Sequence, residues 1–156
     1  MDPDNVADRR AARVLVIDSR DRVLLLRAHD PHRADVGAWW HAPGGGLNQG
    51  ETAPEAARRE LQEEIGLAIG ELSGVVHAEV VSFHYFGRRV RQQQWFYVTR
   101  VDDHVVDFSG QEDEERNAID AARWWSVSDL QTTTEEFFPA VLPELLAKIV
   151  AQPRTT

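Results

Sequence analysis

Cysteine is absent from the 156 residues of this chain, which excludes disulfides, thiolate nucleophiles and cysteine-ligated zinc sites. Long apolar runs are also absent, and the longest fall well short of the roughly 20 residues that a membrane-spanning helix needs. The first ten residues are polar and acidic and lack the apolar core of a signal peptide. These absences predict a cytoplasmic protein that does not bind membranes.

Positive charge is in short supply, with 17 basic against 26 acidic residues and a net charge of −9. This balance argues against binding to duplex nucleic acid, whose phosphates need a basic surface. An acidic protein that handles an acidic substrate needs bound cations. The length predicts one domain, and we find neither an internal repeat nor a low-complexity segment. We place a flexible tail at 1–10, the domain at 11–151 and a short tail at 152–156.

The densest pattern in the chain is a glycine-rich loop followed by a short helix, from Gly44 to Gly66. Thr52 and Glu55 have the spacing of a capping box, with Pro54 in the first turn. Gly66 is a C-terminal cap. The pattern therefore predicts a helix that begins after Thr52 and ends before Gly66.

Three carboxylates of this helix, Glu60, Glu63 and Glu64, fall within an arc of about 100° on a helical wheel. Ala57, Leu61 and Ile65 form the adjacent apolar stripe, so the acids lie at the edge of a packed face. Nothing about folding requires three carboxylates so close together. A solvated acidic face is one interpretation. A site for Mg²⁺, which prefers oxygen ligands, is the other.

The segment GGLNQGETAPEAARRELQEEIGL, residues 45–67, is similar at every fixed position to the Nudix box, the signature of the Nudix (MutT-like) hydrolases. The resemblance implies an α/β fold, an α/β/α sandwich with a mixed β-sheet between helices. It also implies Mg²⁺, which Mn²⁺ can replace, bound by Glu60, Glu63, Glu64 and the carbonyl of Gly45. Arg59 would orient Glu63, and Glu51 would brace the loop.

The element order outside the box agrees with this fold. Val14–Ile17 and Val23–Leu26 are continuous apolar segments, which indicates strands covered on both faces. Further elements are predicted as strands at 39–42, 71–86, 91–101 and 121–127, a short helical turn capped by Ser128, and a C-terminal helix at 139–151.

Several residues outside the box are candidates for binding substrate. Trp39 or Trp40 could stack on a base, although tryptophans are more often core residues. Arg27 precedes a polar loop and could contact phosphate, or it could be hydrated surface. Gly44 and Gly46 would let the main chain approach the substrate. Tyr85 lies 18 residues after the box, near the position of a tyrosine in dinucleoside polyphosphate enzymes of the family, and chance placement explains it equally well.

The resemblance implies hydrolysis of a nucleoside diphosphate linked to another moiety, such as a nucleoside triphosphate, a nucleotide sugar or a dinucleoside polyphosphate. We expect a catalytic set of Arg59, Glu60 and Glu63, with Glu63 or a carboxylate of the acidic run at 112–115 as general base. Glu114 and Glu115 are the candidates in that run, which could equally be solvated charge. The expected partner is a small molecule, and the protein is expected to be a monomer or a homodimer.

Two other functions are compatible with the fold. A catalytically silent Nudix domain could act as a nucleotide sensor or an interaction module, but the complete carboxylate set argues against it. An isomerase resembling isopentenyl diphosphate isomerase would use a cysteine, which this chain lacks. Stacking on a tryptophan would tolerate every base, so the sequence predicts modest base selectivity.

Overall fold

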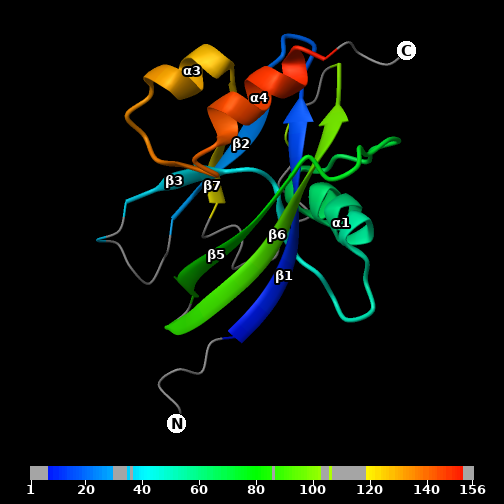
Figure 1. The fold of residues 1–156 in the computed structure, drawn as a ribbon, viewed down its shortest axis with the longest axis vertical. Coiled ribbons are helices and arrows are strands. Elements are labelled where there is room, and N and C mark those ends of the chain that lie inside the picture. The colour runs from blue at the N-terminus through cyan, green and yellow to red at the C-terminus, as the bar shows by residue number, and fades with distance from the viewer. Residues whose placement is uncertain are drawn as a thin grey trace. The chain divides into compact units, whose positions relative to one another are not determined.

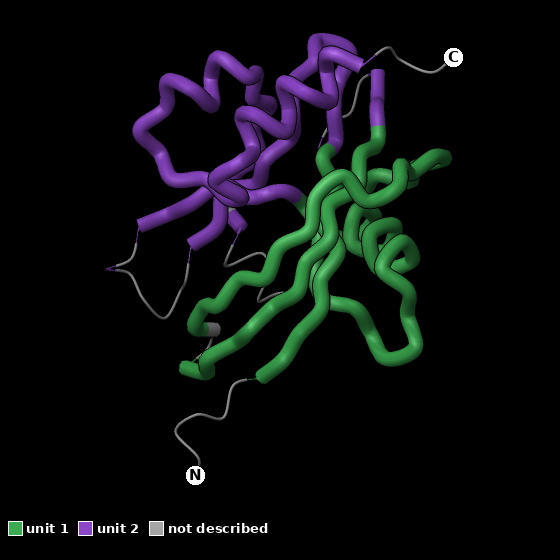
Figure 2. Tube along the Cα trace, in the orientation of Figure 1, with its two compact units in different colours: residues 1–15, 43–99, 107–110 green, residues 16–42, 100–106, 111–156 purple. Residues whose placement is uncertain are grey.

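The computed structural model describes residues 7–29, 35, 37–85, 87–102, 106 and 119–152. The chain forms two compact units (Figure 2), one made of residues 1–15, 43–99 and 107–110, and the other of residues 16–42, 100–106 and 111–156. We call them unit 1 and unit 2 and describe each by itself.

Unit 1 contains most of β1 (Ala7–Ile17), β4 (Gly44–Gly46), helix α1 (Ala53–Ile65), β5 (His77–Tyr85) and nearly all of β6 (Arg88–Arg100). The hydrogen-bonded strand order is β5–β6–β1, and β4 also pairs with β1. β5 and β6 are antiparallel, whereas the arrows of β6 and β1 point the same way in Figure 1. Ala57, Leu61 and Ile65 of α1 are completely buried, which confirms the apolar stripe.

Unit 2 contains the end of β1, β2 (Val23–Ala28), β3 (Trp39–His41), β7 (Ile119–Trp125), α3 (Val127–Thr132), β8 (Phe137–Phe138) and α4 (Leu142–Val150). β2 pairs antiparallel with both β3 and β7, and β3 pairs parallel with β8. The sheet is therefore mixed, as expected. On α4, Leu142, Leu145, Leu146 and Ile149 are buried.

The continuous apolar strands are buried on both faces. Val14–Ile17 and Val23–Leu26 have no exposed surface, which confirms the prediction from their composition. Between them the chain turns at Asp18, whose carboxylate accepts hydrogen bonds from the backbone N–H groups of Arg20 and Arg22. Asp21 takes a positive φ of 58° in this turn.

Some element limits differ from the sequence predictions. We expected a loose tail through residue 10, but β1 begins at Ala7. The short helix is capped by Ser126, not by Ser128, because Ser126 and Asp129 form a reciprocal capping box. Arg88 and Arg89, which lie between the strands predicted at 71–86 and 91–101, are strand residues paired with Tyr85 and His84. The outer limits of the domain stay a prediction, because residues 1–6 and 153–156 lie outside the described part of the chain.

No helix in the described part of the chain is long and apolar enough to cross a membrane.

Candidate diphosphate and metal site

Helix α1 begins and ends where the sequence predicts. The Thr52 side chain accepts a hydrogen bond from the backbone N–H of Glu55, and the Glu55 carboxylate accepts one from the backbone N–H of Thr52. At the other end, Gly66 takes the left-handed conformation with φ 70° and donates to the carbonyls of Gln62 and Leu61. These caps fix the helix relative to the glycine loop that precedes it in the chain.

Strand β4 brings the glycine loop against both β1 and α1. Gly44, Gly45 and Gly46 pair with Arg13, Ala12 and Ala11 of β1. Gly44 has φ 147°, and a side chain there would collide with the carbonyl of Ala12. A Cβ on Gly45 would lie 2.6 Å from the Glu60 carboxyl group. Glycine is therefore required for the close approach of this loop to α1.

Gly44 is held from both sides by charged groups. The Glu64 carboxylate accepts a hydrogen bond from its N–H at 2.9 Å, and Nη1 of Arg13 donates to its carbonyl at 3.3 Å. Burial lowers the pKa of Arg13, an effect that the nearby Glu64 carboxylate opposes. The sequence analysis assigned no role to Arg13. The pattern that could have pointed to a buried functional role is an arginine directly before four apolar strand residues.

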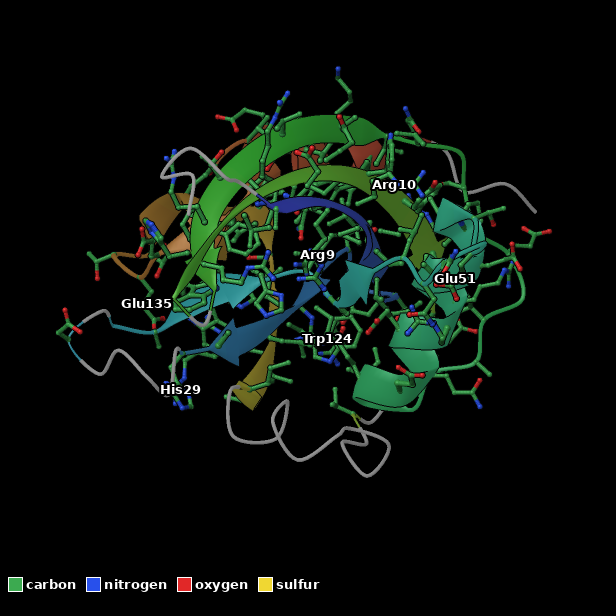
Figure 3. All side chains as sticks on the ribbon, turned by 90° about the horizontal axis from the view of Figure 1, so that it is seen from below. Arg9, Arg10, His29, Glu51, Trp124 and Glu135 are labelled. Carbon is green, nitrogen blue, oxygen red and sulfur yellow. The ribbon has the colours of Figure 1, made fainter. Side chains whose placement is uncertain are left out.

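Arg59 is the centre of the carboxylate cluster. Its guanidinium forms a bidentate pair with Glu51, through Nε at 2.8 Å and Nη2 at 2.9 Å. Its Nη1 donates to Glu60 at 2.9 Å and to Glu63 at 3.2 Å, and Nη2 also donates to the carbonyl of Gly46 at 2.9 Å. The structure thus confirms the predicted contact with Glu63 and adds three others. Figure 3 shows Glu51 beside α1.

The helix buries its acids more deeply than we expected. Glu60 and Glu64 are only 8% and 3% exposed, whereas the Glu63 side chain remains 45% exposed. Burial raises the pKa of Glu60, and the Glu63 charge adds to this while Arg59 opposes it. Such an arrangement is costly for folding alone, since buried carboxylates need a compensating cation.

Glu51 braces the loop, as predicted, and it does so as an anion. The Arg59 hydrogen bonds, helped by the N–H of Asn48, lower the pKa of Glu51 from 4.5 to about 2. Pairing with Glu51 in turn holds the pKa of Arg59 above its usual value. The ionised form of Glu51 is therefore the one that the folded state favours.

A pH-dependent stability difference follows for Glu51→Gln. A carboxylate with a depressed pKa stabilises the fold fully above its unfolded pKa and loses this contribution as the pH falls through the folded pKa. The loss in free energy of unfolding caused by Glu51→Gln should therefore be largest above pH 4.5 and shrink toward pH 2. Denaturant unfolding of both proteins at a series of pH values measures this. A difference that stays constant over the range would contradict the assignment.

The donor set fits a hard divalent cation by its chemistry. Glu60, Glu63, Glu64 and the Gly45 carbonyl offer only oxygen atoms, which Mg²⁺ and Mn²⁺ prefer. Within the described residues, however, no three acidic or histidine side chains are arranged to hold a metal ion. The reason is visible in the contacts: Glu60 and Glu63 are turned to Arg59, and Glu64 is turned to Gly44. Their role as metal ligands stays a prediction.

The remaining predicted residues lie in unit 2 or outside the described chain. Trp40 is 6% exposed and packs edge-on against Trp125 with ring centroids 5.2 Å apart, so it is a core residue. Trp39 is half-buried and is the one left as a candidate for stacking. Arg27 lies 5.9 Å above the Trp40 ring. Glu114 and Glu115 lie outside the described residues, as does the side chain of Tyr85.

Comparison with known proteins identifies the family. The family model described as NUDIX domain matches residues 7–145. An RNA pyrophosphohydrolase of Rhodospirillum rubrum is 29% identical, over 93% of this chain and 91% of the relative.

Two solved structures share the fold. The MutT protein of Methanosarcina mazei has a TM-score of 0.63 at 19% identity, over 94% of this chain and 96% of that one. A C. elegans Ap4A hydrolase has a TM-score of 0.57 at 21% identity, over 92% and 96%. These neighbours confirm the α/β/α sandwich with a mixed sheet. The chain belongs to the NUDIX domain family and is a Nudix hydrolase, an enzyme that acts on a phosphoric anhydride bond.

Proposed function

We propose that this enzyme is a Mg²⁺-dependent pyrophosphohydrolase that cleaves a nucleoside diphosphate linked to another moiety. The observation that carries the proposal is the cluster around Arg59, in which three carboxylates gather against a glycine loop whose Gly44 has no room for a side chain beside the backbone of β1. A divalent cation held by Glu60, Glu63, Glu64 and the Gly45 carbonyl would neutralise diphosphate oxygens and lower the pKa of a bound water.

The protein's own groups would divide the remaining work. Arg59 holds Glu60 and Glu63 in fixed orientations, and the Glu64 and Arg13 contacts fix the Gly44 peptide unit. Glu63 is the most exposed of the three helix carboxylates, so it is our candidate for taking the proton from the attacking water. Glu114 and Glu115 are the alternatives for this step.

The substrates to be tested are chosen from those named for the relatives and from the classes expected from the sequence. The Rhodospirillum rubrum relative is named an RNA pyrophosphohydrolase, and the C. elegans neighbour is named an Ap4A hydrolase. Triphosphorylated RNA ends, dinucleoside polyphosphates, nucleoside triphosphates and nucleotide sugars all contain the diphosphate that this site would bind. The diphosphate alone does not distinguish among them.

A panel assay tests the proposal. The purified protein is incubated with each of these four substrate classes and Mg²⁺, and released phosphate, pyrophosphate and nucleotide are quantified. We expect turnover of at least one class, its complete loss in excess EDTA and its recovery with Mg²⁺ or Mn²⁺. Binding of nucleotides without turnover of any class would contradict the proposal and favour a nucleotide sensor. Turnover that persists in EDTA would contradict the metal requirement.

A further inference from the structure

One side of β5 and β6 in unit 1 is open to solvent. Side chains alternate between the two faces of a strand, and on the inner face Gln92, Gln94 and Phe96 are almost completely buried. Their neighbours on the other face are exposed or half-buried. The register pairs these neighbours across the two strands as Ala78 with Trp95, Val80 with Gln93, Ser82 with Arg91 and His84 with Arg89. We call these eight residues the open face.

Arg10 of β1 extends the open face toward the glycine loop. β1 lies next to β6, and the two strands point the same way in Figure 1. The backbone N–H of Val101 donates to the carbonyl of Ile17, which in a parallel pair sets Val101 level with Asp18. Counting back along both strands places Arg10 level with Gln93 and on the same face. Figure 3 shows Arg10 on the outer side of the curved strands, where it is exposed.

The open face and Arg10 carry positive charge that the fold does not use. Arg10, Arg89 and Arg91 are exposed, and none of them forms a hydrogen bond or an ion pair within the described part of the chain. The acids of these three strands are Glu79, which lies on the inner face, and Asp8, which forms no ion pair among the described residues. The whole chain carries a net charge of −9. A polyanion that the rest of the protein repels would therefore be directed to this face.

Protection of the sheet edge does not explain these arginines. Charged side chains on an edge strand prevent its pairing with another chain, but β5 is the edge strand and β6 is paired on both sides. Arg89 and Arg91 belong to β6. The edge strand itself presents uncharged small and apolar side chains on the open face, with Val80 51% exposed. The arginines therefore indicate an anionic partner.

Trp95 adds an aromatic surface to this charge. Its side chain is half-buried beside Ala78, and it lies four residues along β6 from Arg91, about 13 Å. A small anion would occupy only one end of a face of this length. Single-stranded nucleic acids use the whole of such a surface, because bases stack on aromatic side chains while arginines contact the backbone phosphates.

The open face leads to the proposed diphosphate site. Arg10 and Ala12 lie on the same side of β1, and Ala12 pairs with Gly45, where a Cβ would lie 2.6 Å from the Glu60 carboxyl group of α1. Helix α1 and the open face therefore occupy neighbouring parts of one side of the sheet. The carbonyl of Arg10 also accepts a hydrogen bond from the N–H of Leu47, directly after the glycine loop. β1 alone separates β6 from β4, so two strand spacings, about 10 Å, lie between them.

We propose that the open face and Arg10 bind the chain of a single-stranded RNA whose 5′ phosphates occupy the diphosphate site, an inference that rests on the proposed function. Of the substrate classes considered above, triphosphorylated RNA is the one with a chain that continues beyond the terminal nucleotides. Arg10, Arg89 and Arg91 contact backbone phosphates, and Trp95 stacks on a base. The face thereby selects RNA over free nucleotides, which share the diphosphate but lack the chain.

Binding is measured by fluorescence anisotropy with an RNA of about 12 nucleotides that has a 5′ hydroxyl group and a 3′ fluorophore. Excess EDTA is present, so neither turnover nor metal-held phosphates contribute. Arg89→Gln/Arg91→Gln should weaken binding about 10-fold or more at about 0.1 M KCl. It should also lower the slope of log K against log [KCl] by about 1.4, which is about 0.7 for each lost phosphate contact. Trp95→Leu should weaken binding about 5-fold or more with the wild-type slope, because it removes stacking and no charge.

Arg20→Gln/Arg58→Gln is the matched control, because it removes the same amount of charge from an exposed turn and from the exposed side of α1, outside the open face. Its Kd and its salt slope should stay close to the wild-type values. Equal losses in the two double variants would overturn the inference, as would a wild-type protein that does not bind this RNA. A wild-type dimer that becomes monomeric in Arg89→Gln/Arg91→Gln, measured by light scattering, would also overturn it, because the face would then bind a second copy.

Turnover tests whether the open face serves the diphosphate site. The kcat/KM for a triphosphorylated RNA of the same sequence, divided by the kcat/KM for ATP, should fall about 10-fold in Arg89→Gln/Arg91→Gln and stay unchanged in the control. An unchanged ratio in both variants would overturn the inference while leaving the proposed function intact. RNA binding that follows these expectations in a protein without turnover would support the open face as an RNA site and contradict the proposed function alone.

Discussion

Glu64→Gln should lower kcat by on the order of 10²-fold or more while leaving the fold intact. Glu64 is 3% exposed and accepts the N–H of Gly44 at 2.9 Å. A glutamine oxygen can accept the same hydrogen bond, so the substitution removes the charge and keeps the contact. The loss therefore reports the electrostatic role of Glu64 and not the packing of the glycine loop. Steady-state kinetics with saturating Mg²⁺, together with circular dichroism, measure both quantities.

Glu55→Gln is the control for that variant, because it makes the same change on the same helix. Glu55 is exposed and closes the capping box with Thr52, and glutamine serves in such a box as well as glutamate. We expect its kcat to stay within about two-fold of the wild type. Equal losses in the two variants, or near-full activity of Glu64→Gln, would remove Glu64 from the proposed metal site.

The local structure of residues 45–67 was predictable because helix caps and an apolar helix face depend on residues close together in the sequence. Thr52, Glu55 and Gly66 are caps whose geometry depends on neighbours within one helical turn, and the structure has all three as expected. The apolar stripe of α1 follows from helical periodicity in the same way. The contact between Arg59 and Glu63 joins residues four apart on one helix, a distance fixed by the helix itself.

The contacts that were missed join residues far apart in the sequence. Arg13 and Gly44 are 31 residues apart, and only the register of β1 with β4 brings them together. The hydrogen bond from the Gln94 side chain to the Glu79 carboxylate likewise depends on the register of β5 with β6, which sets these two residues opposite each other. Sequence periodicity says which face a strand residue occupies, but it does not say which residue of another strand lies beside it. The burial of Glu60 and Glu64 was missed for the same reason, since it depends on what packs against α1.

Arg59→Gln should produce a protein whose stability depends strongly on divalent cations. The substitution leaves Glu51, Glu60 and Glu63 without the guanidinium that contacts all three. Removing one partner of a fully buried pair costs about 3–5 kcal/mol. Because the Arg59 side chain is 25% exposed, we expect a smaller loss in free energy of unfolding, about 2 kcal/mol in EDTA at neutral pH. We also expect kcat to fall about 10²-fold, because the carboxylates lose their orientation.

Added Mg²⁺ then distinguishes a metal site from a simple ion-pair cluster. A cation that binds only the folded protein raises its stability according to its affinity. Carboxylates no longer paired with Arg59 should bind it more tightly, so Mg²⁺ should raise the melting temperature of Arg59→Gln more than that of the wild type. Arg58→Gln is the matched control, because the Arg58 guanidinium donates to the carbonyls of Ile69 and Gly70 and, among the described residues, pairs with no carboxylate. It should lose little activity and respond to Mg²⁺ as the wild type does. If Mg²⁺ stabilises all three proteins equally, these carboxylates are an ion-pair network around Arg59 and the metal is held elsewhere.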